Sequence, residues 1–138
     1  MKQLATLTLE SLEGDGLRFG ARTGRIAFTL DSGPTVSYPS PVETLLASVG
    51  ACTGMDVIAI LRKKRQNVTG YEVEVEGERN DEHPRRFTRF SIVHRFRGSD
   101  LKPAALEEAI RLSEEKYCSV IATLRGCVEI KSRYEVVA

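Results

Sequence analysis

Two cysteines, Cys52 and Cys118, are the residues of this chain with the greatest potential for chemistry. Cys52 lies in the most apolar run of the sequence, SVGACTGMDV at residues 48–57, and Cys118 follows a charged, amphipathic stretch at residues 100–116. A nearby cation or a helix N-terminus lowers the pKa of a thiol and makes it nucleophilic, whereas apolar burial alone raises the pKa and makes the thiol inert. The surroundings of each sulfur therefore decide between a reactive thiol and a small core residue.

The other residues that could bind a metal or form a disulfide are few. Cys127 opens the last predicted strand, where we expect an inert core residue. His83 falls in a turn and His94 in a strand, and neither is spaced from a cysteine as zinc ligands usually are, so we expect no metal. A zinc site formed by Cys52, Cys118 and a histidine is the minor alternative. Three cysteines are a small and odd number, which argues against a structural disulfide framework in the reducing compartment that we expect. Any disulfide should therefore be transient.

Length and charge limit the classes of protein that fit. The chain has 138 residues, which favours one domain over residues 1–138. Its 20 Lys and Arg balance 19 Asp and Glu, so no bulk charge attracts nucleic acid, an anionic membrane or acidic substrates. The basic run at residues 62–65 is best explained as the C-terminal end of a helix.

The expected location is the cytoplasm, with no membrane partner. The N-terminal MKQLATLTLE is interrupted by threonines and lacks the continuous apolar stretch of a signal peptide. The apolar run at residues 45–61 contains Asp56 and two glycines and falls short of the ~20 residues that a membrane span needs. We therefore expect a buried helix there.

The N-terminal third of the chain favours a small antiparallel sheet. Residues 4–10 alternate between apolar and polar positions, as a strand with one wetter face does. The EGDG turn at residues 13–16 ends this strand, and two short strands follow at residues 17–22 and 25–31, closing at DSGP, residues 31–34.

A long helix is predicted from residue 40 to about residue 65. Ser40 is a suitable N-cap, Pro41 suits the first helical position, and Glu43 completes a capping box. The helix is apolar nearly all round, so it must be enclosed on most sides. A chain this short can hardly enclose such a helix alone, and we therefore expect an obligate homodimer.

The remainder alternates strands and helices in blocks. A hairpin is predicted from residues 68–79 and 87–98, with a break in phase near Phe90 and with Ile92 and His94 on one side. An amphipathic helix is predicted over residues 100–116, and Cys118 marks its end or the restart of a helix. Residues 119–126 continue as helix or as a turn of it until Gly126 stops it, and residues 127–137 form the last strand. The order βββ-α-ββ-α-β predicts an α+β fold with mixed or antiparallel sheets.

Three segments together resemble the OsmC/Ohr family of organic hydroperoxide-reducing proteins. They are PSPVETLLASVGACTGMDV, HPRRFTRFSIVHRF and EEKYCSVIATL, with the two cysteines 66 residues apart. The form of these segments is similar to the OsmC-like branch rather than to the Ohr branch. The resemblance implies an intertwined homodimer in which sheets sandwich long central helices, with two active sites at the interface.

The resemblance also implies the chemistry of each thiol. Cys52 would be the peroxidatic cysteine and Cys118 would resolve its sulfenic acid as a disulfide, without a cofactor. An external thiol, lipoyl-type in the Ohr branch, would regenerate the pair. GARTGRI, residues 20–26, resembles the family segment GGRxGxV, which places the arginine that stabilises the thiolate at Arg22, with Arg25 as the alternative.

Two residues, Glu43 and Asp56, are candidates for the carboxylate that would hold this arginine. In the Ohr branch a glutamate lies ten residues before the cysteine, where this chain has Val42, and Glu43 is one position later. In an unbroken helix Glu43 would sit ~13 Å along the axis from Cys52, so it would act on the partner subunit or through Arg22. Asp56 shares a helix face with Cys52 and could bind the arginine instead.

The sequence therefore favours a thiol-dependent peroxidase for small organic hydroperoxides. We expect a preference for apolar peroxides because Leu45, Leu46, Val49 and Met55 would line the site. The alternative is a non-enzymatic or redox-sensing OsmC-like protein that binds a small apolar ligand in the dimer cleft.

Overall fold

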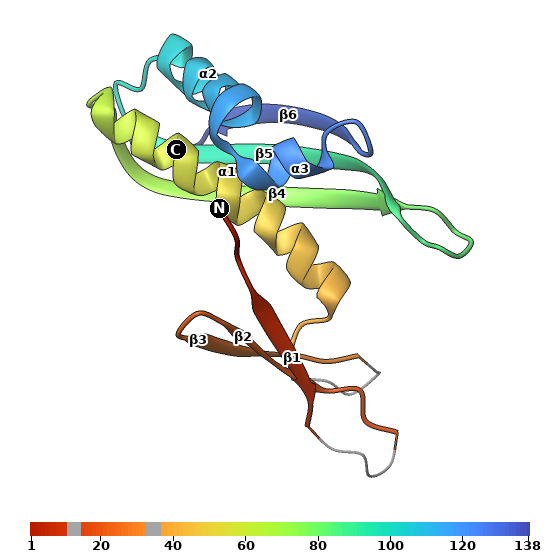
Figure 1. Ribbon diagram of the computed structural model, residues 1–138. Coiled ribbons are helices and arrows are strands. Elements are labelled where there is room, and N and C mark those ends of the chain that lie inside the picture. The colour runs from red at the N-terminus through yellow and green to blue at the C-terminus, as the bar shows by residue number, and fades with distance from the viewer. Residues whose placement is uncertain (11–14, 33–36) are drawn as a thin grey trace. The chain divides into compact units, whose positions relative to one another are not determined.

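The computed structural model describes residues 1–10, 15–32 and 37–138, which form two compact units (Figure 1). The first comprises Met1–Leu45 and the second Leu46–Ala138. The turns predicted at EGDG and DSGP include residues 13–14 and 33–34, which lie outside the described residues. The prediction of a single domain stays a prediction.

The first unit contains the predicted three-stranded antiparallel sheet. Its strands are β1 (Ala5–Leu9), β2 (Phe19–Thr23) and β3 (Ile26–Leu30), in the order β1-β2-β3. Gly24 has φ of +58° between β2 and β3, a conformation that favours glycine in a tight turn.

The long helix α1 spans Pro41–Lys63, close to the predicted range. Its start is a capping box, as predicted: the Ser40 N–H donates to Glu43 Oε1 at 3.1 Å, and the Glu43 N–H donates to Ser40 Oγ at 3.1 Å. These bonds satisfy backbone groups that the first turn of a helix leaves without partners.

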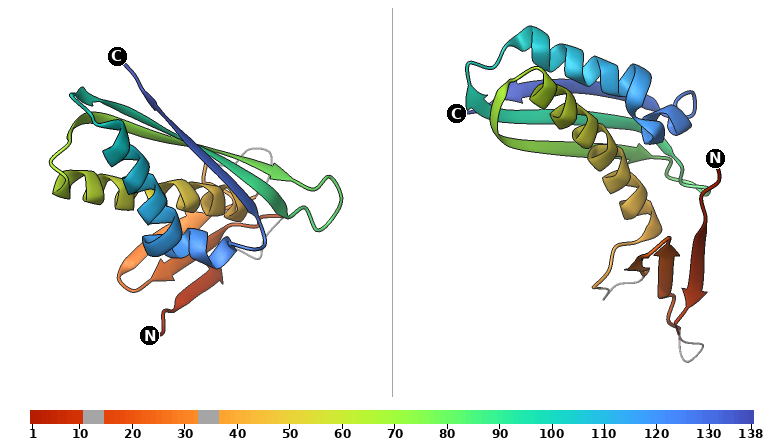
Figure 2. Two further views of the ribbon diagram at one scale, coloured as in Figure 1. Left: turned by 90° about the horizontal axis from the view of Figure 1, so that it is seen from above. Right: turned by 60° about the vertical axis from the view of Figure 1, so that its left-hand side comes forward.

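The second unit is built on a mixed sheet of three long strands. They are β4 (Asn67–Arg79), β5 (Phe87–Ser99) and β6 (Glu129–Val136), in the order β4-β5-β6. β4 and β5 pair antiparallel, and β5 and β6 pair parallel. The helices of this unit all cover one face of the sheet, as both views of Figure 2 show. The sequence order βββ-α-ββ-α-β is thus confirmed.

The helix-covered face of β5 carries Phe90, Ile92, His94 and Phe96. Ile92 and His94 lie on the same face of β5, as predicted. A register shift between Glu78 and Arg79 accounts for the break in phase before Phe90. The shift places Phe87 on the same face as Phe90, and the centroids of the two rings lie 4.9 Å apart.

The second helical region is interrupted at Cys118, where the sequence indicated the end or restart of a helix. It comprises α2 (Pro103–Leu112), the π-helical turn η1 (Ser113–Tyr117) and α3 (Ser119–Leu124). The helix starts three residues later than the predicted residue 100, where Pro103 occupies its first turn. Gly126, with φ of +90°, follows α3 as predicted.

Helix α1 lies close to β4 because two glycines face the strand. A Cβ on Gly50 would lie 3.0 Å from a Val75 methyl, and a Cβ on Gly54 would lie 3.2 Å from a Val73 methyl. By length and composition α1 could cross a membrane. Its contacts with β4 are those of a core helix, and six of its residues are buried: Val49, Gly50, Thr53, Gly54, Val57 and Leu61.

The expectation that Cys127 is a core residue is wrong. Cys127 is exposed and lies in the turn between α3 and β6. The chain reverses at Gly126, and β6 begins only at Glu129, so the apolar alternation of the strand includes Val128 and Ile130 but not Cys127.

A buried histidine makes the stability of the fold depend on pH. His94 is fully buried, and its Nδ1 is 2.6 Å from the Tyr71 hydroxyl, while Nε2 has no hydrogen-bond partner among the described residues. Burial lowers the pKa of His94 to about 4. The folded protein therefore binds fewer protons than the unfolded chain between pH ~6.5 and ~4.

We predict that His94 contributes about 3 kcal/mol to the fall in the free energy of unfolding as the pH decreases from 7 to 4, since one pH unit per differing proton corresponds to about 1.4 kcal/mol. Urea denaturation across this range measures it. His94→Gln keeps a polar partner for Tyr71 but does not titrate, so it should remove most of this slope. The exposed His83→Gln is the matched control and should keep the slope; equal slopes in both variants would contradict the assignment.

Candidate functional site

Cys52 lies on a flank of α1 that is neither fully buried nor fully open. Its side chain is half-buried, whereas Thr53 and Gly54 beside it are buried. Asp56, four residues later, shares this flank and is also half-buried. A solute could therefore reach the Cys52 sulfur from one side while the other side packs against protein.

Cys118 occupies the junction between η1 and α3. It is only 2% exposed, and its backbone N–H donates to the Ser113 carbonyl at 2.8 Å, which closes the π-helical turn. Its Sγ accepts a hydrogen bond from the Ile121 N–H at 3.4 Å and so caps α3. Such π-helical turns occur often at functional sites.

The two sulfurs lie next to each other, together with a carboxylate. The Sγ atoms of Cys52 and Cys118 and a carboxylate oxygen of Asp56 all lie within 4.8 Å of one another. The fold thus joins residues that are 66 positions apart in the sequence. It also confirms that Asp56 and Cys52 share a helix face. No histidine belongs to this cluster among the described residues. The third possible metal ligand beside Cys52 and Cys118 is therefore Asp56 and not a histidine.

The surroundings keep Cys118 protonated at neutral pH. Burial is the largest cause and raises the pKa of the Cys118 thiol to about 11. The nearby Cys52 raises this pKa further, while the N–H groups of Ile121 and Val120 oppose the increase. Cys118 is therefore a poor first nucleophile, and any attack by it on the adjacent sulfur requires that its thiol loses its proton during the step.

A hydrogen-bonded group behind the cluster fixes Asp56. The Ser113 hydroxyl donates to Asp56 Oδ2 at 3.0 Å and lies 2.8 Å from the Thr53 hydroxyl. Both Ser113 and Thr53 are fully buried. Sequence reasoning missed these two residues. The available signal was a polar residue inside each apolar helix face, which needs a buried partner.

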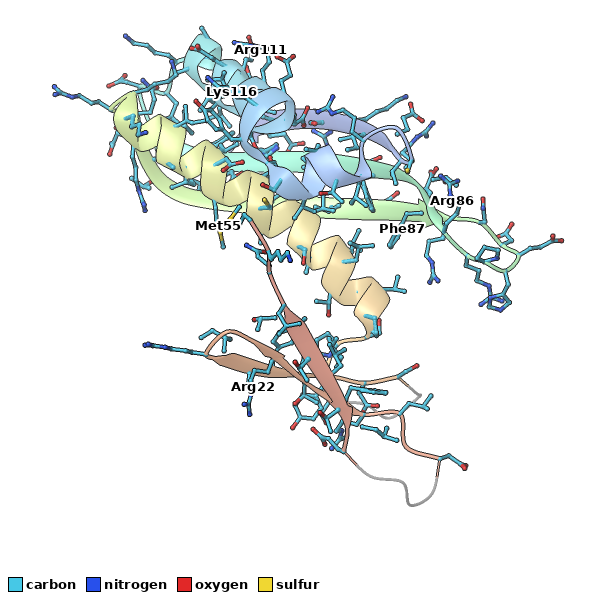
Figure 3. The ribbon with its side chains drawn as sticks, in the orientation of Figure 1. Arg22, Met55, Arg86, Phe87, Arg111 and Lys116 are labelled. Carbon is cyan, nitrogen blue, oxygen red and sulfur yellow. The ribbon has the colours of Figure 1, made fainter. Side chains whose placement is uncertain are left out.

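An apolar cluster forms the wall beside the sulfurs. Val49 and Leu46 pack in the same cluster as Cys118 and Cys52. Met55 is 73% exposed, and Figure 3 shows its side chain protruding from α1. Leu45 is 39% exposed. The other main members of the cluster are Phe90, Ile92, Ile121, Val73 and Val75.

Three of the predicted charged partners, Arg22, Arg25 and Glu43, belong to the first unit. Arg22 is exposed on β2, where it pairs with Thr6 and Ala27 (Figure 3). Arg25 lies in the turn that follows Gly24. Glu43 caps α1, and the hydrogen bonds from Ser40 lower the pKa of its carboxyl. Their pairing with the sulfurs stays a prediction.

The chain belongs to the OsmC-like protein family. Residues 32–133 match the family described as OsmC-like protein. Protein YhfA of Escherichia coli strain K12 is 42% identical to this chain over 125 residues, which cover 90% of the chain and 93% of YhfA.

Solved structures support the same fold. A hypothetical protein from Aquifex aeolicus VF5 superimposes with a TM-score of 0.87 at 33% identity and covers 99% of this chain and 97% of its own. An organic hydroperoxide resistance protein from Elizabethkingia anophelis, with thiocyanate bound, superimposes with a TM-score of 0.72 at 14% identity, over 99% and 97% of the two chains. The second likeness establishes the shared fold alone.

Proposed function

We propose that this protein is a thiol-dependent peroxidase that reduces small organic hydroperoxides to alcohols. The observation that carries the proposal is the position of a half-buried thiol, Cys52, within 4.8 Å of a buried second thiol, Cys118. A hydroperoxide resistance protein with the same fold supports it. The apolar wall that includes Val49 and Leu46 favours peroxides with apolar substituents.

In the first step the Cys52 thiolate attacks the terminal oxygen of the hydroperoxide. The S–O bond forms as the O–O bond breaks, and the alkoxide leaves with a proton from solvent as the alcohol. Cys52 is then a sulfenic acid, oxidised by two electrons, and the peroxide is reduced by two electrons.

In the second step Cys118 attacks the sulfenic sulfur of Cys52. A disulfide of ~2.05 Å forms, and the hydroxyl group leaves as water with the proton of the Cys118 thiol. The raised pKa of Cys118 keeps this proton on the sulfur until the thiol attacks. An external dithiol of the lipoyl type then reduces the disulfide and is itself oxidised to a disulfide.

We further propose that Arg22 stabilises the thiolate. A guanidinium favours the charged form of a neighbouring thiol, and the half-buried carboxylate of Asp56 makes such a cation necessary. In this proposal Glu43 or Asp56 orients the guanidinium, and Arg25 is the alternative cation.

The proposed working form is a homodimer in the cytoplasm. Helix α1 exposes Ala51, Met55 and Ala59, which are spaced four residues apart and so form one apolar stripe. A second copy of the chain would bury this stripe, which supports the dimer expected from the apolar character of the helix.

An alternative function is a non-enzymatic OsmC-like protein that binds a small apolar ligand or senses redox state. The observation that favours it is the low exposure of Cys118, which is only 2% exposed. A buried thiol of this kind also suits a structural role.

Treatment of the reduced protein with one equivalent of cumene hydroperoxide should remove two free thiols per chain and yield one equivalent of cumyl alcohol. The physical reason is the adjacency of the Cys52 and Cys118 sulfurs. Thiol titration, chromatography of the alcohol and peptide mapping measure the outcome. Cys127→Ser is the matched control, because Cys127 is exposed outside the cluster, and it should still lose two thiols.

Two variants separate the steps of this reaction. Cys118→Ser should still yield alcohol in a first turnover and should accumulate a sulfenic acid at Cys52, detectable with dimedone. Cys52→Ser should yield no alcohol. Retention of all three thiols in the unmodified chain would support the binding protein instead.

Arg22→Ala should move the pH midpoint of Cys52 alkylation by iodoacetamide upward by about one pH unit or more, because a guanidinium within a few ångströms favours the thiolate by that order. The measurement is mass spectrometry of alkylated peptides in the Cys127→Ser background. Arg25→Ala distinguishes the two candidates and should leave the midpoint unchanged. An unaltered midpoint in Arg22→Ala would remove Arg22 from the mechanism.

Met55→Lys should convert the dimer to monomers at micromolar concentration, since a charge would be buried without a partner in the proposed interface. Sedimentation velocity gives the mass of each variant. Glu76→Lys changes charge on the exposed side of β4 and should leave the dimer intact. A monomeric parent protein, or a dimeric Met55→Lys, would refute this interface.

A further inference from the structure

The cluster of two thiols and one carboxylate has the composition of a metal site as well as of a redox pair. Cys52 and Asp56 project from one flank of α1, and Cys118 comes from the junction of η1 and α3. We propose that the reduced protein binds one Zn²⁺ ion through Cys52, Cys118 and Asp56. This inference does not depend on peroxidase activity.

The geometry is close to that of a tetrahedral zinc site. Zinc binds thiolate sulfur at ~2.3 Å and carboxylate oxygen at ~2.0–2.2 Å, so two sulfurs on one ion lie about 3.8 Å apart. The donor atoms here lie within 4.8 Å of one another. A contraction of about 1 Å suffices, and a change in the rotamer of the half-buried Cys52 side chain would supply most of it.

The donor types select the cation. Two sulfur ligands favour a thiophilic ion such as Zn²⁺ over Mg²⁺ and Ca²⁺, which prefer sets made of oxygen alone. Three protein ligands leave the fourth position of a tetrahedron open to water or to a small solute. Cys52 is partly exposed, so a small solute could approach the cluster from its side.

Metal binding would require both thiols to lose their protons, and the ion would then compensate the resulting charge. Two thiolates and a carboxylate would bring three negative charges together, and within residues 46–138 no Lys or Arg forms an ion pair with Asp56. A divalent ion neutralises more of this charge than any single side chain could.

A hydrogen bond behind the cluster supports one ligand. Ser113 donates to Asp56 Oδ2 at 3.0 Å, and an ionised carboxylate has enough acceptor sites on its two oxygens to bind an ion as well. The Ser113 hydroxyl is itself paired with Thr53 at 2.8 Å. Ligands in metal sites are commonly oriented by such outer partners, and loss of one typically weakens metal binding 10–100-fold.

The oxidation state of the sulfurs would control the site. A disulfide between Cys52 and Cys118 removes two of the three ligands, so the oxidised protein should not retain the ion. Conversely, bound Zn²⁺ engages the sulfur lone pairs and should protect Cys52 from electrophiles. The same cluster would then be either metal-bound or reactive, but not both.

Titration of the reduced 138-residue chain with Zn²⁺, measured by isothermal titration calorimetry, tests this proposal. We expect one ion per chain. Cys52→Ser and Cys118→Ser should remove measurable binding, and Asp56→Asn should weaken it by about tenfold or more. Cys127→Ser is the matched control for thiol loss and should bind like the parent, and circular dichroism verifies that each variant is folded.

A second readout reports on the sulfur ligands directly. Co²⁺ in place of Zn²⁺ should give thiolate-to-metal charge-transfer absorption that is absent from Cys52→Ser and Cys118→Ser and from the diamide-oxidised protein. Zn²⁺ should also slow the alkylation of Cys52 at least about tenfold. Absence of binding, or binding that survives loss of either cysteine in the cluster, would overturn the inference.

The metal-binding and peroxidase proposals can fail separately. Peroxide turnover is measured with chelator present and no added metal, and metal binding is measured with no peroxide present. Zinc binding without turnover would reject the proposed function and support the metal site, and turnover without zinc binding would do the reverse.

Discussion

The close contact between α1 and β4 is the constraint on which the rest of the second unit depends. Gly50 and Gly54 present no side chain to the strand, so Val73 and Val75 approach the helix backbone. Larger residues at these positions would move the helix away from the sheet. That shift would also separate the Cys52 flank of α1 from the segment that carries Cys118.

The π-helical turn is the second device that brings the sulfurs together. It adds one residue to the helical path between α2 and α3, and the Cys118 N–H bonds to the Ser113 carbonyl as a result. The same turn buries the Ser113 hydroxyl between Thr53 and Asp56. One local irregularity therefore positions a thiol, and through a hydroxyl it also positions a carboxylate.

The electrostatics of the cluster explain why its two thiols are not equivalent. Cys118 is buried, and the pKa of its thiol is raised, whereas Cys52 is half-buried on the same wall. A low-dielectric site opposes two adjacent negative charges. One sulfur can be ionised only if the other keeps its proton or a cation joins them, and this choice separates the redox chemistry from the metal chemistry.

Local patterns in the sequence were sufficient for most of the fold. The alternation in β4, the capping box at Ser40 and the glycine at residue 126 depend on neighbouring residues, so the elements they define were predicted with small errors at the ends. The same-face relation of Cys52 and Asp56 also follows from helix geometry alone. The prediction for Cys127 was wrong because a turn after Gly126 displaces the start of the strand.

The sequence by itself determined the order of the elements, the apolar character of α1 and the presence of two thiols 66 positions apart. Only the tertiary structure decided that Cys118 is buried, that Asp56 completes the cluster and that Ser113 and Thr53 lie behind it. The physical reason is that these contacts join residues about 60 positions apart. Their distances depend on how helices pack on a sheet, which no local pattern encodes.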